Sequence, residues 1–129
     1  MNQLPNPTDG ELAILRVLWA HTEACTVREV HEALLKQKDT AYTTVLKMLT
    51  IMSEKGLVER DESERSHRYR ASLPEPAVQT ALVTDLLNKA FSGSALQLVQ
   101  RALDSRATSA AELQAISVLI AKAKSQQAE

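Results

Sequence analysis

The chain of 129 residues is 44% hydrophobic with only four aromatic residues, which predicts one domain or two very small ones around an aliphatic core. Its formal net charge of −1 gives no evidence for or against nucleic acid, so a DNA-binding surface would have to arise from local segregation of charge. A single cysteine excludes an internal disulfide framework, and the lack of a membrane-length apolar run or a signal-peptide core predicts a soluble protein of the reducing cytoplasm, without a membrane partner.

Two capping boxes predict the first two helices. After a proline-containing lead-in over residues 1–7, the sequence Thr8-Asp9-Gly10-Glu11 begins a helix that runs to about Ala20. The sequence Thr26-Val27-Arg28-Glu29 begins a second helix that runs to about Lys36. Few glycines and prolines elsewhere predict a mostly α-helical protein.

A third helix is predicted over Ala41–Gly56 and completes a helix-turn-helix with the second. At 3.6 residues per turn, one face carries the apolar residues Val45, Met48, Leu49 and Met52. The opposite face carries Thr43, Thr44, Lys47, Thr50 and Ile51. Threonines are mediocre helix formers, and short hydroxyls beside a lysine suit a helix whose N-terminal end enters a DNA groove. The alternative is a solvated amphipathic helix.

After Gly56 the helical spacing of apolar residues gives way to short alternating runs, which predicts a two-stranded hairpin. Its strands are Leu57–Arg60 and His67–Arg70, around the polar loop Asp61–Ser66. Three helices followed by a hairpin predict a winged helix-turn-helix. The wing arginines Arg65, Arg68 and Arg70 are then expected to meet a phosphate backbone, although a solvated charged hairpin is the simpler alternative.

The prolines of Leu73–Pro76 mark the one clear boundary, between a DNA-binding domain (residues 1–73) and a helical region (residues 74–129). Three more helices are predicted there: Ala77–Ala90, Ala95–Ser105, and one that begins with a capping box at Ser109. The region is too small to bury its apolar stripes alone, which favours dimerisation over a monomer whose helices pack back onto the winged domain. The expected dimerisation residues are Leu82, Leu86, Val99, Leu103, Ile116, Leu119 and Ile120.

Several segments, in this order and spacing, resemble the penicillinase-repressor family, which includes the BlaI and MecI repressors and the copper-responsive CopY repressors. They are Glu11–Trp19, Thr26–Val30, Ala41–Val45 with Leu49, Lys55–Val58 and His67–Ala71. The resemblance is dense over residues 8–71 and continues beyond them only as a helical pattern. It implies a winged-helix, homodimeric transcriptional repressor that binds a palindromic double-stranded operator. It also implies that Thr43, Thr44 and Lys47 lie on the recognition helix.

Two departures from the family bear on the inducing signal. The β-lactam-responsive members carry an Asn-Phe bond that an induced protease cuts, and Leu98-Val99 stand at the aligned position. The copper-responsive members end in a cysteine-rich metal motif, whereas the single cysteine here is Cys25. The resemblance therefore implies a repressor and leaves open whether a protease or a ligand induces it.

No pattern of residues indicates an enzyme, a cofactor or a metal. The chain has no glycine-rich phosphate loop and no nucleophile elbow, so no catalytic residue is predicted. The spacing of His21, Cys25 and His31 matches no common zinc site. Two other functions stay open: a winged helix that docks a protein partner through Thr43–Ile51, and a regulator that senses a small ligand at the dimer interface.

Overall fold

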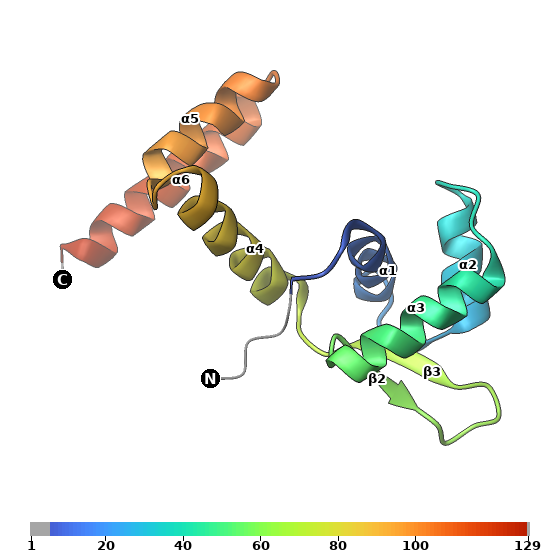
Figure 1. Ribbon diagram of the computed structural model, residues 1–129. Coiled ribbons are helices and arrows are strands. Elements are labelled where there is room, and N and C mark those ends of the chain that lie inside the picture. Colours follow the sequence, from blue (N-terminus) through green and yellow to red (C-terminus); the bar gives the residue numbers. More distant parts are fainter. Residues whose placement is uncertain (1–5, 129) are drawn as a thin grey trace. The chain divides into compact units, whose positions relative to one another are not determined.

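The computed structural model describes residues 6–128, so most of the predicted lead-in lies outside the described residues. The elements are α1 (Asp9–Trp19), β1 (Cys25–Thr26), α2 (Val27–Leu35), α3 (Tyr42–Lys55), β2 (Val58–Asp61), β3 (Arg68–Ala71), α4 (Glu75–Ala90), α5 (Ala95–Ser105) and α6 (Ala110–Gln127) (Figure 1). The predicted class, a mostly helical winged helix-turn-helix followed by three helices, is confirmed. No helix in this described part has the length and apolar content needed to cross a membrane.

The two N-terminal capping boxes form as predicted. Thr8 Oγ1 accepts a hydrogen bond from Glu11 N at 3.2 Å, and Thr8 N donates to Glu11 Oε1 at 2.9 Å. Thr26 and Glu29 make the same pair of bonds at 3.2 and 2.8 Å. These bonds satisfy amide groups that the first turn of a helix leaves free, which explains where α1 and α2 begin.

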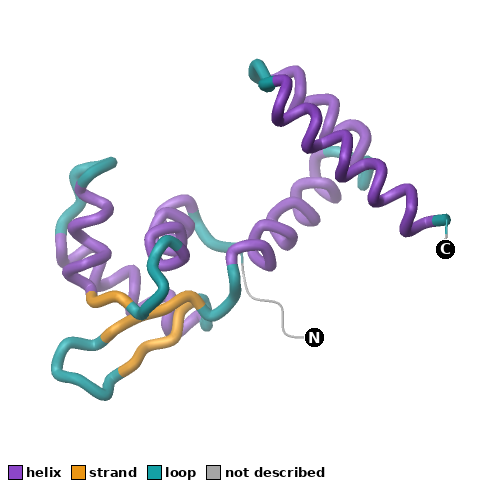
Figure 2. The backbone as a smooth tube through the Cα atoms, turned by 180° about the vertical axis from the view of Figure 1, so that it is seen from behind, coloured by secondary structure: helices purple, strands orange, loops and turns teal. Residues whose placement is uncertain are grey.

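The sheet has three strands where the sequence predicted two. Its order is β1-β3-β2, with both pairings antiparallel, and Figure 2 shows the strands side by side. Cys25 pairs with Tyr69 and Thr26 with Arg68, so the segment before α2 becomes the third strand. The predicted hairpin forms from β2 and β3, whereas β1 was not predicted because it is only two residues long and shows no alternation of its own.

The hydrophobic core lies where α1, α2 and α3 pack against the inner face of the sheet. Figure 1 shows these elements together, and the buried side chains come from all of them. Its fully buried members include Ile14, Leu15, Val30, Val45, Leu49, Met52 and Tyr69. The predicted apolar face of α3 is thus the face that packs inward.

The chain divides into two compact units at Val83 and Thr84, within α4. Val78, in the first turns of α4, is only 7% exposed. The first unit therefore extends past the loop at Leu73, the boundary that the prolines had suggested. Trp19 Nε1 donates to the carbonyl oxygen of Leu73 at 3.0 Å, which fixes that loop to the end of α1.

An ion pair between a buried carboxylate and a partly exposed lysine joins α1 to the last turn of α3. Lys55 Nζ lies 2.8 Å from Glu11 Oε2, and the side chain of Glu11 is 6% exposed. Burial alone would raise the pKa of Glu11, but hydrogen bonds from Lys55 and Thr8 outweigh it and hold the pKa below its ordinary value. The pair fixes the C-terminal end of α3 against α1.

Replacing Glu11 by glutamine is expected to lower the free energy of unfolding by about 1 to 2 kcal/mol at neutral pH, because the charge-assisted bond to Lys55 is lost. Since the pKa of Glu11 is lowered by folding, its contribution is present above the ordinary pKa and is lost as the pH falls through the lowered one. Urea unfolding between about pH 3 and pH 7 measures this.

The matched control is Glu54→Gln, which removes an exposed carboxylate from the same end of α3. It is expected to change stability by less than about 0.5 kcal/mol. Equal losses for the two variants, or a loss for Glu11→Gln that does not shrink in acid, would contradict the role given to the pair.

Candidate nucleic-acid interface

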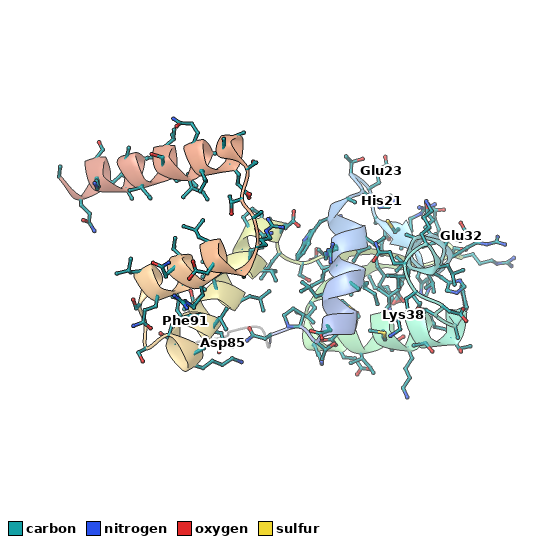
Figure 3. All side chains as sticks on the ribbon, turned by 90° about the horizontal axis from the view of Figure 1, so that it is seen from above. His21, Glu23, Glu32, Lys38, Asp85 and Phe91 are labelled. Carbon is teal, nitrogen blue, oxygen red and sulfur yellow. The ribbon has the colours of Figure 1, made fainter. Side chains whose placement is uncertain are left out.

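The start of α3 is fixed by α2 and not by a capping side chain. Its N-cap, Ala41, makes no side-chain hydrogen bond. Instead His31 Nε2 donates to the carbonyl oxygen of Thr40 at 2.7 Å. The ring of His31 also meets that of Tyr42 edge-on, with centroids 5.7 Å apart. The turn between α2 and α3, where Figure 3 labels Lys38, therefore leads into a helix whose first residue is positioned by tertiary contacts.

The outward face of α3 presents most of the residues predicted for it. Thr43, Thr44 and Lys47 are exposed, and Ile51 is 37% exposed. Thr50 differs, because it is half-buried and its hydroxyl donates to the carbonyl oxygen of Leu46 at 2.9 Å. The hydroxyl of Thr50 is thus engaged within the helix, whereas those of Thr43 and Thr44 lie on the exposed first turn.

Sequence reasoning missed two exposed residues of the same helix. Tyr42 is 46% exposed and Leu46 is 42% exposed, although both are large and mainly apolar. Their i,i+4 spacing was a signal that could have placed them together on one side of the helix. Both line a hollow beside the wing.

This hollow of about 420 Å³ lies between the start of α2, the first half of α3 and the wing. Its lining residues are Thr26, Val27, Arg28, Tyr42, Leu46, Arg65, Ser66, His67 and Tyr69. Its lining mixes polar and apolar groups, and its arginines come from separate segments of the chain. The structure therefore brings Arg65, one of the arginines predicted to contact DNA, to the N-terminal half of α3. It adds Arg28 and His67, which the sequence did not single out.

The other two wing arginines are engaged within the protein. The Nη1 atom of Arg68 donates to the carbonyl oxygen of Ala24 at 3.3 Å and lies 3.5 Å from Glu29 Oε1. Arg70 Nε lies 3.1 Å from Glu59 Oε1, directly across the β2–β3 pairing. The three arginines are therefore not brought to one surface, because β3 places Arg68 and Arg70 on the sheet while Arg65 lies in the loop.

The carboxylate of Glu29 is an ion-pair partner of Arg68 and has a lowered pKa. The hydrogen bond from the backbone of Thr26 is the main cause that lowers the pKa of Glu29, with a smaller contribution from the charge of Arg68. One carboxylate thus caps α2 and also holds an arginine of the wing.

The helices of the second unit leave their apolar side chains in the open. No residue of α5 or α6 is buried among those described. Of the predicted dimerisation residues, Leu119 is 65% exposed and Ile120 is 50% exposed, and Leu86, Val99 and Leu103 are also exposed. Leu82 and Ile116 are half-buried. Leu96, at 78% exposed, was not predicted. Clusters of exposed apolar side chains are typical of interaction sites.

The residues considered for a metal site have other partners. His21 Nδ1 donates to the carbonyl oxygen of Val17 at 2.8 Å, and His31 contacts the turn before α3. Cys25 is buried in β1, and burial raises the pKa of its thiol. Figure 3 shows His21 and Glu23 in the connection after α1. Over residues 6–128 no group of three or more potential ligands comes together.

Comparison with known proteins gives related folds. The solution structure of the DNA-binding domain of the repressor BlaI matches with a TM-score of 0.51 and 27% identity, over 58% of this chain and 90% of that one. The solution structure of the monomeric form of Bacillus licheniformis BlaI in complex with the blaP half-operator matches with a TM-score of 0.50, also at 27% identity and with the same coverage. The likeness supports the winged helix-turn-helix.

Sequence comparison identifies the family. The model of the penicillinase repressor family matches residues 7–122. The transcriptional regulator BlaI of Mycobacterium tuberculosis is 37% identical over 97 residues, which cover 75% of this chain and 70% of that protein. The penicillinase repressor of Bacillus licheniformis is 23% identical over the full length of both. The resemblance found in the motifs is confirmed, and the chain belongs to the penicillinase-repressor family of DNA-binding transcriptional repressors.

Proposed function

We propose that the chain acts in the cytoplasm as a homodimer that represses transcription by binding a palindromic operator. The observation that carries the proposal is the first half of α3, which exposes Thr43, Thr44 and Lys47 and whose Tyr42 and Leu46 line a hollow with Arg65 of the wing. A helix of this kind reads base edges with its N-terminal residues, while a wing meets the sugar-phosphate backbone. The relative solved with a half-operator supports the assignment of one winged unit to one half-site.

In this proposal α3 provides sequence specificity, and the wing provides affinity that does not depend on sequence. Lys47 and Thr43 contribute to sequence discrimination, since a side chain in the major groove can bond to base edges. Arg65 contributes attraction to phosphates, which is the same for all sequences. Arg68 and Arg70, predicted as phosphate contacts, are assigned to holding the wing, because both are paired with carboxylates.

Dimerisation is assigned to the apolar surface of the second unit. A single helix and wing make few contacts, so one half-site alone should bind weakly. Two copies joined through α5 and α6 would present two recognition helices related by a two-fold axis. An inverted repeat is the operator that matches such a pair.

Replacing Lys47 by alanine is expected to lower the ratio of operator affinity to random-DNA affinity by about tenfold. Replacing Arg65 by alanine is expected to weaken binding to both DNAs by the same factor and to reduce the salt slope by about one. Fluorescence anisotropy with the chain's own upstream region and a random duplex, at several salt concentrations, measures both quantities.

Lys122→Ala is the control, because it removes a lysine from α6 in the second unit. It is expected to leave the affinity ratio unchanged. Equal losses on operator and random DNA for Lys47→Ala would refute the assignment of α3 to specificity. Failure of the unmodified protein to prefer any upstream duplex would refute the repressor function itself.

A further inference from the structure

The wing carries no net charge, which is unusual for a segment that meets phosphates. Residues 58–71 contain four arginines and four acidic residues, so the formal charge is four minus four, or zero. The acidic residues are Glu59, Asp61, Glu62 and Glu64. A duplex that approaches the wing therefore meets carboxylates as well as guanidinium groups.

Most of the wing arginines are paired within the protein. Arg60 Nη2 lies 3.1 Å from Glu62 Oε1, and Arg70 Nε lies 3.1 Å from Glu59 Oε1. Arg68 is shared between Glu29 at 3.5 Å and Glu64 at 4.0 Å. Among the described residues, Arg65 is the one wing arginine without a carboxylate within ion-pair distance. A phosphate that reaches any of the others must compete with a carboxylate already in place.

The wing loop that carries Glu62 and Glu64 also carries Arg65, which lines the hollow beside α3. Arg65, Ser66 and His67 line the hollow with Tyr42 and Leu46 of α3, and Figure 1 shows the loop between β2 and β3 extending alongside α3. Glu64 directly precedes Arg65 and is 69% exposed at its side chain. Glu62, at 51% exposed, belongs to the same loop. Both carboxylates are therefore carried by the segment that a bound duplex would approach.

We propose that Glu62 and Glu64 restrain the affinity of this repressor for DNA of any sequence. The proposal rests on the proposed function, because it concerns the same DNA-binding surface. A carboxylate within the Debye length of about 10 Å repels a phosphate and also neutralises a neighbouring arginine. Since binding to random DNA depends almost entirely on phosphate attraction, the carboxylates lower that binding directly. Base contacts from α3 then make up a larger share of the free energy of operator binding.

This restraint has a function in a genome. Random sequence offers a very large number of competing sites, so a repressor with a strongly basic wing would be held mostly at non-operator DNA. The first 73 residues carry 10 lysines and arginines against 11 acidic residues. Two of these acidic residues, Glu62 and Glu64, form ion pairs with arginines of the wing. The acidic residues thus lower the fraction of repressor that is lost to the bulk chromosome.

The test is the double variant Glu62→Gln with Glu64→Gln in the full chain, which keeps side-chain size and removes two charges. Anisotropy with a random-sequence duplex at about 0.1 M salt is expected to show binding about tenfold tighter than that of the unmodified protein. The gain should fall towards zero near 0.5 M salt, because the Debye length is then only about 4 Å. Thermal unfolding checks that both proteins are equally folded.

The matched control is Asp85→Asn with Asp104→Asn. These two carboxylates are also paired with cations, Lys89 and Arg101, but lie in the second unit. The control changes the total charge by the same amount and is expected to alter affinity by less than about twofold. A gain no larger than that of the control, or one that persists at high salt, would overturn the proposal. The proposed repressor function is tested separately, by whether the unmodified protein binds its operator more tightly than random DNA.

Discussion

Replacing Leu119 and Ile120 of α6 by glutamate is expected to convert the proposed homodimer into a monomer and to weaken operator binding more than about a hundredfold. Both side chains are at least half exposed, so a single copy should tolerate the change. In a dimer interface the new carboxylates would be buried without partners, which disfavours association. Once the copies separate, each half-site is bound independently and the gain from simultaneous binding is lost. Sedimentation and gel shifts on the same preparations measure the two effects.

The control is Gln114→Glu, which adds a carboxylate to an exposed position of the same helix outside the predicted apolar stripe. It is expected to stay dimeric. An operator with about five base pairs inserted at its centre gives a second comparison, because half a helical turn moves one half-site to the other side of the duplex. The unmodified protein should lose affinity for this operator, whereas the monomeric variant should not distinguish it. A protein that sediments as a monomer before any substitution would contradict the dimer.

Replacing Leu49 by alanine is expected to lower the free energy of unfolding of the first unit by about 3 to 4 kcal/mol. Leu49 is fully buried on the inner face of α3, so the substitution leaves a cavity where the helix packs on the core. Such a loss is a large share of the stability of a small domain. Trp19 is the single tryptophan and belongs to the first unit, so its fluorescence during urea unfolding reports on that unit.

Leu46→Ala provides the matched comparison, because it removes the same side chain from the same helix at a position that is 42% exposed. It is expected to cost less than about 1 kcal/mol in stability and to weaken DNA binding, since Leu46 lines the hollow beside the wing. Leu49→Ala, below its unfolding transition, should keep its affinity for DNA. The same stability loss in both variants would mean that the inner and outer faces of α3 are wrongly assigned.

The helices and their inward faces could be predicted because their signals are local. The capping boxes at Thr8 and Thr26 fixed two helix starts, and the apolar spacing of Val45, Leu49 and Met52 gave the buried face of α3. The strand β1 could not be predicted, because its two residues acquire their partners only when the hairpin folds against them. Its existence depends on contacts far apart in the sequence.

The candidate interface was predictable in position but not in detail. Thr43, Thr44 and Lys47 follow from helical periodicity, and the structure has them exposed. The partners of Arg68 do not follow from periodicity, because Ala24 and Glu29 reach it through the pairing of β1 with β3. A pattern of charges identifies which residues are basic, whereas the fold decides which of them are already neutralised by neighbours.

The short strand β1 links the two parts of the protein that we propose contact DNA, α3 with its helix-turn-helix and the wing. Thr26 pairs with Arg68 in the sheet and also caps α2, so the base of the wing and the helix-turn-helix share a residue. Rotation of the wing relative to α2 would break the cap and the sheet pairing together. We therefore expect the distance between α3 and the base of the wing to stay nearly constant. When the groove width of the DNA varies, the loop between β2 and β3 or the duplex itself has to change shape. The affinity for DNA should therefore depend on how stiff the sequence is, including at base pairs that the protein does not contact.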